Sequence, residues 1–287
     1  MTDELATLHV LRGGKPTTLA TEIPRRAIAV CGGKGGVGKS TLALNIAIAY
    51  AQAGARTLMV DTALGMADLN LLLGVAPERS ILDALGGTPL DEILVAAHGI
   101  HLLPALNGSY VLSTIGPSVQ RRVLELVRSL SERFDMCIVD VAGGIGQVQT
   151  AFAGATTDAI VVVNPEPLSM ADAYATLKVL ALEQHVRHAF IVPNRVTSRS
   201  EADEVTARVA ALVQRFLDLD VTALPYIPAD PCVAEAAQVG VPLMVHSPDC
   251  PAARAIRQLP GALASLAPST ATTSWFRTPA RAQGETR

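Results

Sequence analysis

The chain has 287 residues, of which 49% are hydrophobic and 17% are charged. This length suits one large α/β domain or two small ones, and the composition excludes an intrinsically disordered chain, which would have few apolar residues. The net charge of −3 argues against a broad positive surface, so we expect no specific nucleic-acid partner. Apolar runs such as Ala159–Val163 are shorter than the ~18 residues that a membrane-spanning helix needs. The N-terminus carries acids where a secretory signal begins with basic residues, so we expect a cytoplasmic protein.

Short β-rich runs alternate with helical segments along most of the chain. The expected strands are Ala27–Cys31, Thr57–Asp61, His101–Leu103, Met136–Asp140, Ile160–Asn164, Phe190–Pro193 and Val221–Ile227. The expected helices are Lys39–Ala53, Val119–Arg133, Met170–Gln184, Glu201–Leu219 and Cys250–Leu266. Several of these strands are apolar almost throughout, as in a parallel sheet that is covered on both faces. The alternation predicts an α/β fold with a doubly wound, mostly parallel sheet and helices on both faces.

No internal repeat or clear linker divides the chain, so we expect one domain over residues 26–266. Residues 1–25 and 267–287 differ from this middle part in being rich in glycine, proline or small polar residues. We expect both segments to be tails, and the second to be flexible.

The four cysteines are widely spaced and form no C-x-x-C pair; they are Cys31, Cys137, Cys232 and Cys250. Such spacing is unlike that of zinc or iron–sulfur sites. We therefore expect buried, small apolar side chains in a reducing compartment rather than a metal site, and we set aside a metal-cluster carrier.

A glycine-rich segment lies between the first expected strand and the first expected helix. Its sequence GKGGVGKS, residues 33–40, fits G-x-x-x-x-G-K-[ST] in the context that identifies a phosphate-binding loop. The nucleotide-binding residues predicted here are Gly33, Lys34, Gly35, Gly36, Val37, Gly38, Lys39, Ser40 and Thr41. The glycines let main-chain N–H groups turn toward the phosphates, and the helix N-terminus adds a favourable dipole. We expect Lys39 to neutralise β- and γ-phosphate charge and Ser40 to ligate Mg²⁺.

A second lysine, Lys34, gives the loop the pattern K-G-G-x-G-K-[ST]. This pattern resembles the deviant Walker A motif of MinD, ParA and related ATPases. The resemblance implies a MinD-like P-loop domain that binds ATP or ADP with Mg²⁺, and an ATP-held homodimer in which Lys34 reaches the partner's nucleotide. Asn194 and Arg195 resemble the adenine-contacting position of this family, and Pro228 and Asp230 would lie along the other side of the base.

Two expected strands end in an aspartate, Asp61 and Asp140. At the carboxyl ends of parallel strands, both carboxylates would face the phosphate site. Asp140 resembles the Walker B residue that holds Mg²⁺ through water, and Asp61 resembles the first acid of switch I. We therefore expect Ser40, Asp61 and Asp140 to form the Mg²⁺ site. The expected catalytic residues are Lys34, Lys39 and Asp61.

One carboxylate of the family pattern is missing. Switch I reads D-x-D-x-G in the family, where the second acid orients the attacking water, but Ala63 stands at that position here. Loss of a positioned base typically costs ~10²–10⁴ in rate. Asp68, and Gln147 where the relatives carry an acid, depart from the pattern as well. We expect firm nucleotide binding with slow or impaired hydrolysis, either a weak ATPase or a switch without catalysis.

Three stretches narrow the resemblance to the flagellar-number ATPases FlhG/FleN. Pro167–Tyr174 resembles the family's P-T-S-I-T-D-A-Y segment, Arg215–Asp218 matches R-F-L-D, and Tyr226–Asp230 contains I-P-x-D. The resemblance implies an ATP-switched dimer that controls flagellar number and placement. Its implied partners are an FlhF-like GTPase, flagellar switch components or a flagellar transcription activator. A MinD-like, membrane-cycling ATPase of division-site placement and a ParA-like partition ATPase stay open as alternatives.

The two ends depart from the flagellar family. The activator motif D-Q-A-x-x-L-R is absent from the N-terminal MTDELATLHVLRGG, which counts against stimulation of an FlhF-like GTPase. At the other end, Pro268, Pro279 and Gly284 interrupt the apolar face that a membrane-lying helix needs. We expect weak or no membrane binding, and at most a peripheral location at the inner face of the plasma membrane.

Overall fold

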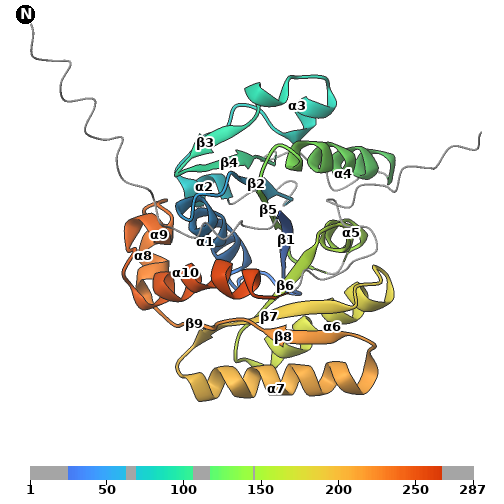
Figure 1. The fold of residues 1–287 in the computed structure, drawn as a ribbon, viewed down its shortest axis with the longest axis vertical. Coiled ribbons are helices and arrows are strands. Elements are labelled where there is room, and N and C mark those ends of the chain that lie inside the picture. The colour runs from blue at the N-terminus through green and yellow to red at the C-terminus, as the bar shows by residue number, and fades with distance from the viewer. Residues whose placement is uncertain (1–24, 63–68, 106–116, 145, 267–287) are drawn as a thin grey trace, which may run out of the picture.

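The computed structural model describes residues 25–62, 69–105, 117–144 and 146–266. These residues form a nine-stranded sheet in the order β3-β4-β2-β5-β1-β6-β7-β8, with β9 paired to β7 (Figure 1). The strands are β1 (Arg26–Cys31), β2 (Thr57–Asp61), β3 (Val95–Ala97), β4 (Ile100–Leu103), β5 (Met136–Asp140), β6 (Asp158–Val163), β7 (His188–Val196), β8 (Asp220–Ala223) and β9 (Ile227–Pro228). Every described pairing is parallel except that of β3 with β4. The predicted doubly wound, mostly parallel sheet is confirmed.

Helices cover both faces of this sheet (Figure 1). The helices are α1 (Lys39–Gln52), α2 (Leu69–Leu73), α3 (Ile81–Leu85), α4 (Pro117–Ser131), α5 (Gln147–Ala155), α6 (Pro167–Leu182), α7 (Arg199–Phe216), α8 (Pro231–Gln238), α9 (Leu243–His246) and α10 (Pro251–Ala264), with a 3₁₀ turn at Leu90–Glu92. One hydrophobic core joins the sheet to α1, α2, α8, α9 and α10. The other joins it to α3, α4, α5, α6 and α7.

The central strand β1 shows how the sequence serves both cores. All of its residues are buried, and alternate side chains point to opposite faces of a strand. Ile28 and Val30 pack into the core beneath α1 and α10, while Ala27, Ala29 and Cys31 pack into the core beneath α4 to α7. This two-sided burial explains why β1 reads as an unbroken apolar run.

The structure corrects one predicted strand. Instead of a single strand over Val221–Ile227, the chain forms β8, which ends at Ala223, and β9, which begins at Ile227. Pro225 lies between them, and proline has no N–H to donate to the ladder. Both strands nevertheless pair with β7, so the break moves the chain toward the end of β7 without leaving the sheet.

The prediction that the four cysteines are separate from one another is wrong for one pair. Cys31 and Cys137 are buried in the core as predicted, but Cys232 and Cys250 lie close together, beside Asp230. The start of α8 carries the first and the residue before α10 carries the second. Spacing along the chain could not show this, because two separate helices bring the thiols together.

The predicted tails, residues 1–25 and 267–287, fall almost wholly outside the described residues, so the domain limits 26–266 stay a prediction. Among the described helices, none has both the length and the apolar character that crossing a membrane requires.

Candidate functional site

The site lies in the loop that joins β1 to α1. The loop turns sharply, with left-handed backbone at Gly36 (φ 82°) and Gly38 (φ 96°), a conformation that glycine adopts without strain. Gly38 immediately precedes the first residue of α1, Lys39, so the helix N-terminus opens onto the loop. A helix end of this kind presents unpaired N–H groups and a positive dipole end, which suit an anion.

Two glycines let other parts of the chain approach this loop closely. A Cβ atom added at Gly33 would lie 2.4 Å from the carbonyl oxygen of Asp172 in α6. One added at Gly143, after β5, would lie 3.3 Å from Nζ of Lys39 and 3.4 Å from the backbone nitrogen of Gly35. A larger residue at position 33 would clash with the backbone of α6, so glycine is required there, whereas at position 143 the neighbouring atoms would have to give way by a few tenths of an ångström.

The two lysines of the loop have different surroundings. Lys39 is 7% exposed, and its Nζ donates a hydrogen bond of 2.9 Å to the carbonyl oxygen of Lys34. Burial lowers the pKa of the Lys39 ammonium group, and the nearby Asp140 carboxylate acts in the opposite direction. The side chain of Lys34 lies in an exposed part of the loop. Lys39 is therefore held inside the cradle, whereas Lys34 is available to a group outside this chain.

The two predicted acids are brought together at the same edge of the sheet. Asp61 and Asp140 are register partners at the carboxyl ends of β2 and β5, and each is 2% exposed. Thr62 connects the ends of β2 and β5 by two hydrogen bonds. Its hydroxyl donates to the carbonyl oxygen of Asp140 over 2.7 Å and accepts from the backbone nitrogen of Ala142 over 3.2 Å. Sequence reasoning missed this threonine, although its place directly after Asp61 is the signal that could have found it.

A cavity of about 430 Å³ opens beside the first turn of α1. Its lining includes all of the residues predicted to surround the base, Asn194, Arg195, Pro228 and Asp230, together with Gly38 and Thr41 of the loop and helix. The remaining lining is largely apolar and was not predicted: Leu42, Ile227, Ala229, Val233, Ala234, Ala237, Leu243 and Ile256. An apolar cavity with a few polar groups beside a phosphate cradle suits a flat aromatic base.

Hydrogen bonds within the chain fix the side chains of two polar residues of this cavity, Asn194 and Asp230. Nδ2 of Asn194 donates a hydrogen bond of 2.8 Å to the carbonyl oxygen of Val37, in the loop. The carboxylate of Asp230 accepts from the backbone nitrogens of Cys232 and Ala252, each over 3.0 Å. Burial acts to raise the pKa of the Asp230 carboxyl, but the hydrogen bonds that it accepts, first among them those from the Ala252 and Cys232 N–H groups, together lower this pKa below its ordinary value. Asp230 thus shapes the cavity wall, with its carboxylate already accepting from two helix N-termini.

Several predicted features fall outside what the structure describes. Ala63 and Asp68 belong to the segment 63–68, which lies outside the described residues, so the missing switch I acid stays a sequence observation. Gln147 is the first residue of α5. The structure therefore brings together the glycine-rich loop, the two acids and the four residues predicted to contact the base, and the missing switch I acid stays a prediction from the sequence.

Comparison with known proteins agrees with this geometry. The family model for the CobQ/CobB/MinD/ParA nucleotide binding domain matches residues 28–243, which contain the loop, both acids and most of the base cavity. The chain belongs to this family. The match therefore covers the loop between β1 and α1 as well as the sheet around it.

Two of the similar relatives are an antiactivator and a flagellum site-determining protein. The chain is 33% identical to the antiactivator FleN of Pseudomonas aeruginosa over 217 residues, which cover 75% of this chain and 78% of FleN. It is 31% identical to the flagellum site-determining protein YlxH of Helicobacter pylori over 176 residues, which cover 61% of this chain and 59% of YlxH.

Solved structures of MinD match the fold of this family member. The cell division ATPase MinD of Pyrococcus furiosus matches with a TM-score of 0.69 and 26% identity, over 85% of this chain and 100% of that one. The septum site-determining protein MinD of Pyrococcus horikoshii OT3, solved in complex with Mg-ADP, matches with a TM-score of 0.69 and 26% identity, over 83% of this chain and 95% of that one.

Proposed function

We propose that this protein is an ATP-binding, nucleotide-switched dimer that regulates the number or placement of flagella and hydrolyses ATP slowly. The observation that carries the proposal is a loop with one buried and one exposed lysine beside a base-sized cavity. Its biological direction comes from the similarity to FleN and YlxH.

The cradle has the features that a triphosphate requires. The loop of residues 33–38 leads directly into α1, so its N–H groups and the helix dipole would act on the phosphates together. A Cβ atom at Gly35 or Gly36 would meet nothing within 4 Å, which leaves that side of the loop open to a ligand. Lys39, buried with its ammonium group directed at the loop carbonyl of Lys34, supplies positive charge where the β- and γ-phosphates would lie.

The chemistry of the neighbouring oxygen donors suits Mg²⁺. This cation prefers hydroxyl, carboxylate and water oxygens, and bound Mg²⁺ would neutralise phosphate charge. Ser40 at the start of α1, with Asp61 and Asp140 at the strand ends, would hold the ion directly or through water. The mutual burial of Asp61 and Asp140, 2% exposed each, supports this assignment, because a nearby cation offsets the cost of burying two negative groups.

The dimer proposal rests on Lys34. Its exposed side chain extends from a loop whose shape is set by Lys39 and Gly143. From there Lys34 would reach the phosphates of a nucleotide held by a second copy, which ties association to the bound triphosphate. Slow turnover follows from Ala63, which cannot orient a water molecule as a carboxylate does.

The partners proposed for the switch are those of the flagellar family. They are an FlhF-like GTPase, components of the flagellar switch, or a flagellar transcription activator. We place the protein in the cytoplasm, with at most peripheral association at the inner face of the plasma membrane. Division-site placement is the second candidate function. It is supported by the similarity to MinD of Bacillus subtilis, which is 28% identical over 225 residues, and to the MinD structures.

Calorimetry and light scattering test the biochemical part. We expect the protein to bind both ADP and a non-hydrolysable ATP analogue in the presence of Mg²⁺. Its mass in solution should double with the ATP analogue but not with ADP. Lys39→Ala should abolish binding. Lys34→Ala should still bind nucleotide but stay monomeric, whereas Lys178→Ala, which removes an exposed lysine of α6, should behave as wild type. Absence of binding heat with either nucleotide would overturn the proposal.

Deletion of the gene in the source organism tests the biological part. We expect a changed number or position of flagella in electron micrographs, restored by the wild-type gene and not by the Lys34→Ala variant. Normal flagella together with misplaced division septa would instead support the MinD-like alternative. Normal flagella with a defect in chromosome or plasmid segregation would support a ParA-like role.

A further inference from the structure

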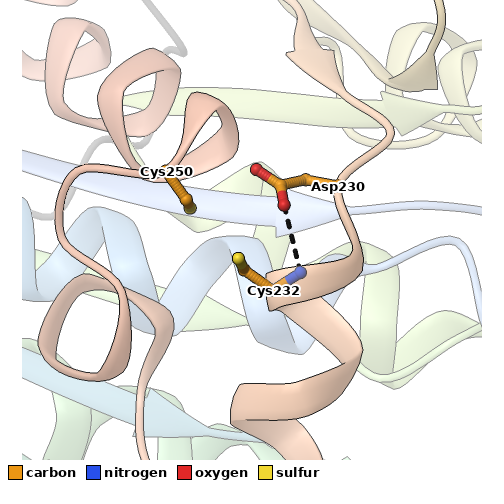
Figure 2. A group of neighbouring side chains, drawn as sticks. All are labelled: Asp230, Cys232 and Cys250. Carbon is orange, nitrogen blue, oxygen red and sulfur yellow. Dashed lines mark hydrogen bonds between the residues drawn. The ribbon is translucent and has the colours of Figure 1, made fainter.

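A cluster of sulfur and oxygen donors lies where the N-termini of α8 and α10 converge (Figure 2). Asp230 precedes α8, Cys232 is in its first turn, and Cys250 precedes α10. One ligand atom from each of these residues lies within 4.8 Å of the others. Figure 2 shows the carboxylate and both thiols directed toward a common point between the two helices.

We propose that Asp230, Cys232 and Cys250 bind a thiophilic divalent cation of the Zn²⁺ type, with water in the fourth position. In tetrahedral zinc sites the Zn–S distance is about 2.3 Å and the Zn–O distance about 2.0–2.2 Å, so the ligand atoms lie roughly 3.5–3.8 Å apart. Starting from separations of at most 4.8 Å, the atoms need to close by about 1.0–1.3 Å at most, a distance that side-chain rotation covers. This site is separate from the Mg²⁺ site proposed above, and the inference does not depend on nucleotide binding.

Backbone N–H groups already orient the donors. The Asp230 carboxylate accepts from the nitrogens of Cys232 and Ala252, and Sγ of Cys250 accepts from the nitrogen of Ala253 over 3.3 Å. Oriented ligands of this kind are typical of protein metal sites, where outer N–H groups fix each ligand and offset its charge. The positive ends of two helix dipoles add to this effect, because α8 and α10 both begin at the cluster.

A divalent cation suits the chemistry of this donor set. It would draw together the two sulfur donors and the Asp230 carboxylate, which as anions repel one another. The proposal rests on the closeness of the three donor atoms and on the backbone N–H groups that orient Asp230 and Cys250.

The position of the cluster gives the cation a structural effect. Asp230 lines the base cavity, as do Pro228 and Ile256 of α10. A cation held by Asp230, Cys232 and Cys250 would cross-link the segment that forms one cavity wall to the start of α10. Metal binding would therefore hold the wall of the base cavity in a single arrangement.

Cobalt spectroscopy on the reduced, full-length protein without nucleotide tests the proposal. We expect Co²⁺ to bind at one site per chain with a thiolate-to-cobalt charge-transfer band and the intense visible bands of tetrahedral Co²⁺, and Zn²⁺ to remove both. Millimolar Mg²⁺ is included in the buffer to compete with Co²⁺ for the proposed oxygen-ligand site. The charge-transfer band also distinguishes the two sites, because Ser40, Asp61 and Asp140 offer no sulfur.

Single substitutions then assign the ligands. Cys232→Ser and Cys250→Ser should each weaken Co²⁺ and Zn²⁺ binding by more than the roughly 10- to 100-fold that loss of an outer-shell partner costs. Cys137→Ala, which removes a thiol buried elsewhere in the core, should leave the cobalt spectrum unchanged. Circular dichroism and unfolding of each variant separate loss of a ligand from loss of the fold, and Cys232 is preferred because it is only partly buried.

Three results would overturn the proposal. One is the absence of a thiolate–cobalt band in the reduced, folded wild-type protein. Another is a band that persists in folded Cys232→Ser. The third is a Cys232–Cys250 disulfide found by peptide mass spectrometry in freshly isolated protein, combined with no cobalt binding after reduction, which would mark the pair as a redox site instead.

Discussion

Asn194 at the end of β7 and Val37 in the phosphate loop, 157 positions apart in the sequence, are joined by a hydrogen bond of 2.8 Å from Nδ2 to the carbonyl oxygen. A Cβ atom at the neighbouring Gly38 would lie 2.6 Å from the same amide nitrogen. The base cavity and the phosphate cradle therefore share one contact. With its nitrogen committed to the loop, the amide can offer its oxygen to the amino group of adenine.

This contact predicts a double effect of Asn194→Ala. The change removes one hydrogen bond to the loop, worth about 1 kcal/mol, and the group that would accept from the adenine amino group. We expect an affinity for ATP that is at least about fivefold weaker, with a smaller preference for ATP over GTP, measured by calorimetry. Asn164→Ala, which removes a buried asparagine immediately after β6, serves as the control for general destabilisation. Unchanged affinity and unchanged ATP preference in Asn194→Ala would remove the residue from the base site.

Gly143→Ala should distort the phosphate loop, because residue 143 lies against the loop but is not part of it. The added methyl group would lie 3.3 Å from the Lys39 ammonium nitrogen, so that either the lysine or the segment after β5 has to move. We expect weaker binding of the triphosphate than of the diphosphate relative to wild type, because Lys39 is assigned to the β- and γ-phosphates. Gly261→Ala in α10 is the matched control, since its Cβ would meet nothing within 4 Å. That change should leave binding intact and raise stability by about 0.5–1 kcal/mol through helix propensity.

Ala63→Asp should restore hydrolysis. The substitution supplies the carboxylate that the D-x-D-x-G pattern places near the attacking water, and a positioned base is worth about 10²–10⁴ in rate. We expect faster phosphate release under single-turnover conditions with unchanged ATP affinity. Ala63→Asn has nearly the same size but cannot take up a proton, so it should stay slow. Equal rates for wild type and Ala63→Asp would show that another residue already positions the water.

A stability prediction concerns the first residue of β1. Arg26, 1% exposed, pairs with the buried Asp158 at 3.7 Å and donates to the carbonyl oxygen of Leu266. Breaking a buried ion pair typically costs about 3–5 kcal/mol. We expect Arg26→Met to lower the free energy of unfolding by about 3 kcal/mol in urea denaturation. We expect a loss at the low end of the roughly 3–5 kcal/mol range because the Thr157 hydroxyl still donates to the Asp158 carboxylate.

The double variant Arg26→Met/Asp158→Asn checks the reason for that loss. It removes the buried negative charge as well, so it should recover part of the stability that Arg26→Met loses. A double variant that is as unstable as the single one would assign the loss to packing, or to the bond with Leu266, rather than to charge.

Local signals explain why the phosphate cradle could be predicted. The loop carries its chemistry in consecutive residues, and the acids Asp61 and Asp140 end apolar runs whose parallel pairing places them at one edge. The same logic failed at Pro225, which divides an apolar run into two strands, because periodicity alone does not register one missing N–H group. The three-residue strand β3 was too short to give any period.

Long-range convergence explains what could not be predicted. The apolar lining of the base cavity comes from α1, α8, α9, α10 and β9, and no spacing within one of these elements indicates the others. The meeting of Cys232 with Cys250 has the same origin, since it depends on how two helices pack. Asn194 and Arg195 were found only because their strand-end position resembles a family pattern.

Helix α10 joins two distant parts of the molecule. Its first turn contacts Asp230 through Ala252, and the residue that follows its end region, Leu266, is held by Arg26 at the start of β1. A helix of 14 residues is about 21 Å long, so α10 reaches from the cavity residue Asp230 to the start of the central strand β1. A displacement of the cavity wall at Asp230 would therefore act on the same rigid helix whose other end lies beside Arg26.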